Sequence, residues 1–451
     1  MVRVVSPLRS LVVTCLALAP FARAEGTAPA VQASAREEYR LRSSAAPDQS
    51  SHDMRLGLDV GVEDASGHLA AGVNLGLFWT LQRSVAEGTT DGLATVLDVR
   101  NPFFDVYQLT ADYRGAGPFR MARVGRQPAE HGRPATFDGA SILLRPTPSL
   151  SVFAFGGRSV HFFEVPQAGF LTFDDWLASA GVGFKPLSWL RFEADYRLLL
   201  ERVRDEAGEL TPVTNHSYGM TAWLRPSDAV WAKATVRGLG DLLAEASLSG
   251  HVFFAGPGLA LDARFLLQPV TLGLLNELDN PFYLTLGPSL PHARWRLDAS
   301  RVFALTKGAL ELHLGWAGRA LLRDPPTAFN RTSNRLYLSA GVRDLGLPGL
   351  SAQVSLERLT NTAVPFLGKG IFTINAAAAY ERSLVRGEVG VQYYQYQYTY
   401  FRDVEELADV RVVFAELRVK PWPWLSVRAL YQLELFDRTR HTVTLSLAQV
   451  Y

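Results

Sequence analysis

The chain consists of short segments in which apolar and polar residues alternate, from about residue 37 to the C-terminus. Residues 190–201 show the pattern most clearly. One set of alternate positions holds Leu190, Phe192, Ala194, Tyr196 and Leu198, and the other holds Arg191, Glu193, Asp195, Arg197, Leu199 and Glu201. Because successive side chains of a strand point to opposite faces, this alternation predicts a β-strand with one apolar and one charged face.

The same alternation recurs along the chain between turns of two kinds. It is found at 56–62, 73–81, 107–114, 176–184, 259–267, 294–299, 310–316, 336–342, 372–381 and 442–447. Short turns are expected at 225–228, 255–258 and 305–308, among others, and long polar loops at 201–217, 269–292, 321–334 and 400–409. Short turns at one end and long loops at the other are typical of outer-membrane barrels.

The number of segments decides between a membrane barrel and a soluble sandwich, which also alternates. Strongly twisted open sheets rarely exceed ~10 strands, whereas a barrel strand needs only ~9–11 residues. We therefore predict an all-β fold, a transmembrane antiparallel up-and-down β-barrel of about 18–22 strands with short periplasmic turns and longer extracellular loops. Residues 36–44 would supply the first strand, and weaker segments at 118–127 and 137–146 count as strands.

The N-terminus has the features of a secretory signal peptide. Arg3 and Arg9 precede an apolar stretch at 11–22, and Ala22 and Ala24 provide a small-x-small cleavage site. We predict a signal peptide at 1–24, a flexible lead at 25–36 and one barrel domain at 37–451; an uncleaved anchor is the alternative. The only cysteine, Cys15, lies in the signal peptide, so the mature chain would have no disulfide.

Composition and motifs give no indication of nucleic-acid binding or of catalysis. Removal of residues 1–24 takes away three of the 45 basic residues and none of the 44 acidic ones, which leaves 42 − 44 = −2. The histidines lack metal-ligand spacing, and no cofactor is predicted. His216 and Ser217 are neighbours on a predicted strand, so their side chains would point apart and form no dyad. Residues 238–243 are expected to be a loop tip.

A short stretch resembles the alginate export family of outer-membrane barrels. The matching residues are Gly125, Arg126 and Gln127, then Gly132 and Arg133, then Phe137, Asp138 and Gly139. The resemblance implies a monomeric barrel in the outer membrane of a Gram-negative bacterium that passes a polyanionic polysaccharide or a small solute. The C-terminus, with Val443, Leu445, Leu447 and Tyr451, resembles the signal read by the barrel-assembly machinery.

The charged faces of the predicted strands would surround a wet lumen. The lumen would hold Arg114, Arg191, Arg197, Arg264, Arg294, Arg296 and Arg319 beside Asp112, Glu193, Asp195, Asp262, Asp298 and Glu311. Such charges could form paired ladders that brace the wall, or a ring that focuses a polyanion. Arg120, Arg123 and Arg126, three apart, would need a bulge or a position at the rim.

The predicted function is a passive channel or exporter for a polar or charged solute, and the family resemblance implies a polysaccharide such as alginate. The candidate pore-lining residues are Arg126, Arg191, Glu193, Asp195, Arg197, Glu201, Arg294, Arg296 and Asp298. The expected partners are the outer-membrane bilayer, the barrel-assembly machinery and the solute. A structural or adhesion barrel with a filled lumen is the alternative, and an outer-membrane hydrolase is a remote one.

Overall fold

A computed structural model of the chain describes residues 30–44, 49–84, 102–115, 117–131, 135–160, 175–204, 210–271, 290–323, 332–344, 346–361, 371–400, 404–436 and 439–450. Its strands are β1 (Ala30–Ser44), β2 (Gln49–Glu63), β3 (Leu69–Ser84), β4 (Phe103–Arg114), β5 (Phe119–Pro128), β6 (Thr136–Thr147), β7 (Leu150–Ser159), β8 (Trp176–Leu187), β9 (Leu190–Arg204), β10 (Leu210–Ser227), β11 (Val230–Leu239), β12 (Leu242–Phe254), β13 (Leu259–Gln268), β14 (His292–Ala304), β15 (Ala309–Leu321), β16 (Ser333–Arg343), β17 (Leu350–Asn361), β18 (Ile371–Arg382), β19 (Val385–Tyr400), β20 (Val404–Trp422), β21 (Leu425–Leu435) and β22 (Thr439–Val450).

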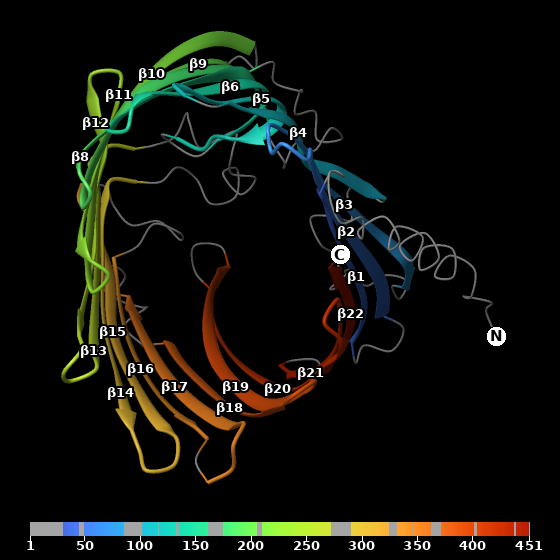
Figure 1. Ribbon diagram of the computed structural model, residues 1–451. Helices are drawn as coiled ribbons and strands as arrows, with labels where there is room; N and C mark the ends of the chain where they lie inside the picture. The colour runs from blue at the N-terminus through green and yellow to red at the C-terminus, as the bar shows by residue number, and fades with distance from the viewer. Residues whose placement is uncertain are drawn as a thin grey trace.

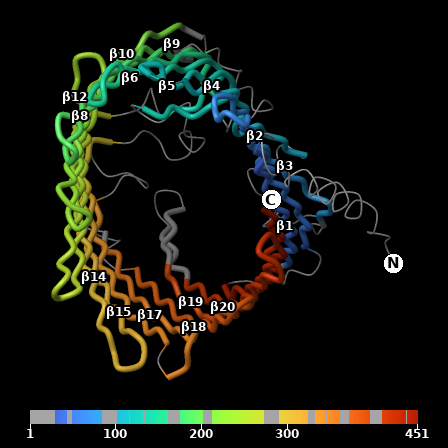
Figure 2. The backbone as a smooth tube through the Cα atoms, viewed as in Figure 1, coloured from blue at the N-terminus to red at the C-terminus, as the bar shows by residue number. Residues whose placement is uncertain are grey.

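The strands form one closed antiparallel barrel (Figure 1). Each strand pairs with its neighbours in the sequence, and β1 closes the wall against β22, with Ser34 opposite Val450. Figure 2 shows the backbone passing round the wall in chain order. The predicted fold class and the upper limit of the predicted strand number are confirmed. The segment at 36–44 lies in β1, which starts at Ala30, and the two weaker segments are β5 and β6.

The connections alternate between short turns and longer segments, as predicted. Residues 148–149, 188–189 and 228–229 are short turns, and β13 is joined to β14 through residues 269–291. We call the two ends of the barrel the short-turn end and the long-loop end. The predicted tip within 238–243 is the turn between β11 and β12, where Gly240 has a φ of 59°.

Two of the predicted long loops are wrong. Within 201–217, β9 continues to Arg204 and β10 begins at Leu210, and within 400–409, β20 already begins at Val404. The end of β9 and the start of β20 carry charged residues at consecutive positions, and the start of β10 mixes polar residues with Pro212, so the alternation that marks a half-apolar strand is lost. The backbone ladder continues because its hydrogen bonds require a partner strand and no particular side chain.

The two faces of the wall differ as the sequence pattern predicts. On β9, Phe192 and Tyr196 are 41% and 47% exposed on the outer face, whereas Glu193 and Arg197 are 7% and 3% exposed on the inner face. On β22, Leu445 also lies on the exposed outer face, opposite Tyr39 of β1. In the part of the chain that the structure describes, no helix has the length and apolarity needed to cross a membrane. The predicted signal peptide and Tyr451 lie outside the described residues.

An apolar cluster on the inner face was not predicted. It contains Phe137, Phe153, Phe155, Leu177 and Leu199, drawn from β6 to β9. The register places Leu177 opposite Leu199, on the same face as Arg197. Ala129 and Ala135, which flank the turn between β5 and β6, pack against this cluster. The cluster is therefore covered by a segment that folds back onto the inner wall.

Glycines make room for this packing. A Cβ on Gly181 would lie 2.4 Å from Cζ of Phe153, so the phenyl ring lies flat across β8. A Cβ on Gly139 would lie 2.0 Å from the carbonyl oxygen of Gly156, a separation that no real Cβ contact shows. At both positions the absent side chain is what lets the inner wall and its cluster pack closely.

Candidate functional site

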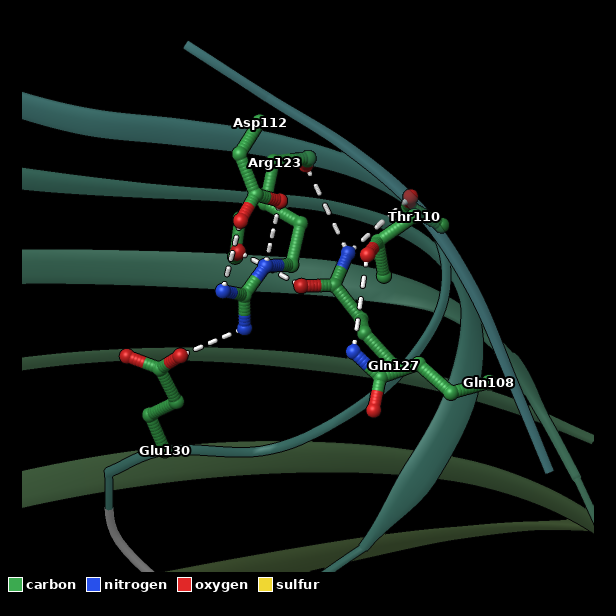
Figure 3. Close-up of polar contacts among 8 residues, drawn as sticks. Gln108, Thr110, Asp112, Arg123, Gln127 and Glu130 are labelled. Atoms are coloured by element: carbon green, nitrogen blue, oxygen red, sulfur yellow. Dashed lines mark hydrogen bonds and ion pairs between the residues drawn. The ribbon is translucent and has the colours of Figure 1, made fainter. Parts of the chain in front are cut away.

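One inner-wall network is centred on Arg123 of β5 (Figure 3). Its guanidinium binds both carboxylate oxygens of Asp112, which lies directly opposite on β4, at 2.6 and 2.9 Å. The remaining terminal nitrogen donates to Glu130 at 2.5 Å. Because Glu130 follows the end of β5, Arg123 ties the segment after β5 to the inner wall. Bidentate pairing of this kind is among the stronger hydrogen-bonded contacts in proteins.

Gln127 extends this network and is only 1% exposed. Its amide nitrogen donates to the carbonyl oxygens of Arg123 and Gly139, at 3.4 and 3.3 Å, and its amide oxygen accepts from Ser141 at 2.7 Å. A buried polar side chain is stable when its donors and acceptors are satisfied in this way. Gln127 therefore holds β5 against β6 just before residues 129–131, which fold back onto the inner wall.

His131 holds the end of this same stretch, residues 129–131, against the inner wall. Its ring stacks on Phe153 with 4.4 Å between centroids, and its Nδ1 lies 3.3 Å from the carboxylate of Glu193. The same carboxylate accepts from Arg191 at 2.8 Å. The contacts of Glu130 and His131 define what we call the in-folded segment, residues 129–131.

Charge ladders brace other parts of the inner wall. Arg42 of β1 donates to Asp53 of β2 at 3.1 and 2.7 Å. On β19 to β21, Arg386 binds Glu388 at 2.9 Å and Arg428 binds Glu416 at 2.7 Å. Here each cation has a carboxylate on its own or an adjacent strand, which matches the bracing interpretation of the sequence.

A different arrangement occurs on β11 to β16, where cations predominate. Residues from these strands line a cavity of about 640 Å³ on the inner wall. We call its cations the basic wall: Lys233, Arg237, Arg264, Arg294, Arg296, Arg319 and Arg335. Among the described residues that line this cavity, Glu245 is the one carboxylate.

The register sets like charges of the basic wall directly opposite one another. Arg264 lies opposite Arg296, and Arg294 lies opposite Arg319. Like charges at such positions are destabilising, each pair by about 0.2–1 kcal/mol. Arg296 is compensated by Asp298 at 2.6 Å, whereas Arg264 and Arg294 form no ion pair with any residue that the structure describes. A bound anion would offset this repulsion.

The predicted site residues of β9 lie on one arc of the lumen. Arg191 and Glu193 form the pair that holds His131. Asp195 lies within electrostatic reach of Arg197 and Arg237, and the guanidinium of Arg197 lies 5.3 Å from the Phe155 ring centre. The side chain of Glu201 lies outside the described residues.

The predicted residues of β14 lie on a second arc. Arg294, Arg296 and Asp298 share the inner face, and four strands, β10 to β13, separate them from β9. The structure therefore places the two groups on different parts of the wall. The charged residues of β9 and those of β14 therefore do not form one continuous ring on neighbouring strands.

Arg126 lies on the outer face of β5, opposite to the predicted lumen position. It pairs across the ladder with Leu109, which is 53% exposed, and alternates with the inward Gln127. It holds Asp138 through two hydrogen bonds of 2.7 Å. A register shift between Phe119 and Met121 supplies the bulge expected at the Arg120, Arg123 and Arg126 spacing. We therefore leave Arg126 out of the lumen-facing set.

Several lumen residues were missed by the sequence analysis. They are Glu130, His131, Trp223, Lys233 and Tyr337. Tyr337 shares the inner face of β16 with Arg335 and accepts from Arg296 at 2.9 Å. The parity of the residues around Arg335 could have identified Tyr337, but no pattern in the sequence marks an in-folded turn.

The side chains of His216 and Ser217 lie on opposite faces of the wall. His216 lies on the outer face, hydrogen-bonded to the hydroxyl of Tyr196, while Ser217 is buried on the inner face opposite Arg197. The prediction that these side chains point apart is confirmed. Among the described residues, no group of three or more potential ligands could hold a metal ion.

Comparison with known proteins supports the fold. No protein-family model matches the chain, and no curated protein sequence matches it. The P pilus usher (PapC) translocation pore superposes with a TM-score of 0.55 at 9% identity, over 93% of this chain and 99% of that one. The chain is also similar, with a TM-score of 0.46 and 9% identity, to a BenF-like porin from Pseudomonas fluorescens Pf-5, over 94% of this chain and 100% of that one. The resemblance to the alginate export family gains no support from these comparisons.

The stretch that suggested that family has a packing role. Gln127 is bonded within the inner wall, Phe137 is fully buried in the apolar cluster, and Gly139 accommodates the backbone of β7. Gly132 and Arg133 lie outside the described residues. These contacts account for the residue types without reference to a cargo.

Proposed function

We propose that this protein is an outer-membrane channel that admits anionic solutes. The observation that carries the proposal is the basic wall, with its opposed arginines, inside a closed barrel whose outer face is apolar; of these arginines, Arg264 and Arg294 form no ion pair with a described residue. The barrel form of the chain and its similarity to a translocation pore in fold are consistent with a passage.

The mechanism is electrostatic and steric. The apolar outer face would be solvated by acyl chains, and the charged inner face by water. Guanidinium groups stay charged at all relevant pH values and donate in a fixed planar fork. They would replace part of the hydration shell of an entering anion and repel cations, without making or breaking bonds.

The setting follows from the same proposal. The signal peptide at 1–24 would direct export, and the C-terminal strand β22 would be read by the barrel-assembly machinery. The mature chain would insert into the outer membrane as a complete barrel, because β1 and β22 close the wall within one chain. A monomeric state is part of the proposal.

The cargo class can be narrowed further as part of the proposal. The cations of the basic wall come from five strands, β11 and β13 to β16. A solute with repeated carboxylates, such as an alginate-like polysaccharide, could contact several of them at once, and small organic anions could bind one after another.

A structural barrel with a filled lumen is the second candidate. The observation in its favour is the in-folded segment, which is packed on the apolar cluster and clamped by Arg123. Such a barrel would be impermeable, so one conductance measurement separates the two functions.

The test uses the purified full-length mature protein in planar bilayers under a KCl gradient. We expect ion conductance and a reversal potential that indicates preference for chloride. In the double variant Arg264→Glu and Arg294→Glu the preference should reverse or vanish, because four charge units are removed from the lumen. Arg382→Glu is the control. It makes the same change of charge at one exposed residue of the short-turn end and should leave the preference unchanged.

Two results would contradict the proposal. A protein that inserts but carries no current would support the filled barrel. A current whose ion preference is the same in the double variant and in wild type would show that the basic wall does not select the solute.

A further inference from the structure

A second cavity lies on the inner wall at the short-turn end. It has a volume of about 520 Å³ and is lined by residues from β6 to β10, together with His131 of the in-folded segment. Its cationic side chains are Arg145, Lys185, Arg191 and Arg225. We call it the mouth cavity.

Trp223 of β10 is the aromatic centre of this cavity. It lies directly opposite Arg191 on one side and Lys233 on the other, so all three share the inner face. The Arg191 guanidinium carbon is 4.8 Å from the indole centre, and the Lys233 ammonium nitrogen is 5.3 Å from it. Both separations are within the range of cation–π attraction. A large aromatic side chain is thus held in the lumen between two cations.

The mouth cavity also has cations free to bind an anion. Arg145 and Lys185 are exposed, and neither forms an ion pair with any residue that the structure describes. Arg225 is engaged by Asp228 at 2.9 Å, and Arg191 by Glu193 at 2.8 Å. The available charge therefore lies at the rim, beside the aromatic centre.

Lys233 connects the two cavities, because it lines the basic-wall cavity and its ammonium group lies against Trp223 of the mouth cavity. A ligand beside Trp223 would already be in contact with the first cation of the basic wall. The two cavities are thus consecutive on one inner surface.

We propose that the mouth cavity is a separate binding site for organic anions that carry a ring, with Trp223 as its specificity-determining residue. The inference rests on the proposed channel function. The anionic group would bind Lys185 on β8, two strands from Trp223, and the ring would pack against the indole of Trp223. Trp295 also lines the basic-wall cavity, but it alternates with the inward Arg294 and Arg296 and lies opposite the outward Phe265, so we expect the basic wall to select for charge and not for a ring.

The test compares two sulfonates that remain ionised at neutral pH. Benzenesulfonate carries a ring and methanesulfonate does not, so they differ in the feature that Trp223 would read. Each is added at increasing concentration to the full-length protein in planar bilayers, and the block of the chloride current is measured. We expect block by benzenesulfonate at a concentration at least about tenfold lower than by methanesulfonate, a factor equivalent to about 1.4 kcal/mol.

Two variants and one control locate the effect. Trp223→Leu should weaken benzenesulfonate block roughly tenfold and leave methanesulfonate block unchanged. Trp223→Phe keeps a smaller aromatic ring and should weaken benzenesulfonate block roughly threefold. This variant replaces Trp223→Leu in the test if the leucine variant does not fold. Trp316→Leu removes an indole from the outer face and should alter neither block.

The failures of the two proposals are distinguishable. Absence of any chloride current would overturn the channel function itself. Chloride current with equal block by the two sulfonates, or benzenesulfonate block unchanged in Trp223→Leu, would overturn the mouth-cavity site while leaving the channel proposal intact.

Discussion

At the scale of single residues, close backbone approach governs the part of the wall between β6 and β8. Gly139 and Gly157 face each other across the ladder between β6 and β7. A Cβ at either position would lie within 2.2 Å of a carbonyl oxygen of the facing strand. Since the obstructing atoms belong to the backbone, no side-chain rotation could relieve the contact.

This packing predicts the effect of Gly139→Ala. The added methyl group should force β6 from β7 and destabilise the folded barrel by about 1–3 kcal/mol, the usual cost of overpacking. Gly61→Ala is the matched control, because nothing lies within 4 Å of its Cβ position. The temperature at which each variant loses its compact, fast-migrating form on unheated gels measures the difference. Equal melting of the two variants would show that this contact is relieved by a small backbone shift.

The sequence predicted correctly for some residues, and wrongly for others, whether the side chain faces inward or outward. The inner and outer assignment of Glu193, Arg197 and Phe192 followed directly from their parity on one strand. The assignment failed for Arg126 because it lies three residues after the inward Arg123 on an unbroken stretch of ladder, from Met121 to Pro128, and so has the opposite direction.

At the scale of elements, the in-folded segment is the feature that most alters the lumen. It is held by an ion pair from Arg123 to Glu130 and by the contact of His131 with Glu193. The Arg123 guanidinium also remains paired with Asp112 if Glu130 is removed. Loss of Glu130 should therefore release the segment without unpairing the wall.

We expect Glu130→Gln to increase the conductance and the current noise of the open channel. The substitution keeps the size of the side chain but weakens the charge-assisted bond to Arg123, so the segment should leave the inner wall more often. Glu311→Gln is the control, since Glu311 has the same 44% side-chain exposure and also pairs with an arginine, Arg343. Single-channel recordings of both variants measure the effect. If the noise increases equally in both variants, loss of lumen charge would account for it, and release of the segment would not.

The strands themselves were largely predictable, because an exposed apolar face repeats every second residue. The exceptions were the ends of β9, β10 and β20 near the long-loop end, which extend beyond the regular alternation of the sequence. There the pairing partner extends the strand, and a partner strand is not visible in a local pattern.

At the scale of the whole molecule, the two halves of the inner wall differ in charge. Ladders on β19 to β21 pair their cations, whereas in the basic wall Arg264 and Arg294 have no carboxylate partner within the described ranges of the chain. The lumen is therefore more positive on the side of the basic wall than on the side of β19 to β21, although the mature chain is close to neutral.

This asymmetry predicts a salt-dependent anion preference. The Debye length falls from about 10 Å at 0.1 M to about 3 Å at 1 M salt, so mobile ions should screen the basic wall at the higher concentration. Reversal potentials at a fixed KCl ratio should indicate a clear chloride preference near 0.1 M and a weaker one near 1 M. A preference that does not depend on salt would indicate selection by steric contacts in place of the field of the wall.

The amino-acid sequence by itself determined that this chain forms many antiparallel strands with one apolar and one charged face, and hence a barrel. That information is local, because side-chain direction on a strand depends only on parity. The tertiary structure alone decided which charges become neighbours, since Arg264 meets Arg296 only through the register of two strands. It also decided that residues 129–131 fold onto the wall, because the cluster that holds them comes from four strands brought together by closure of the sheet.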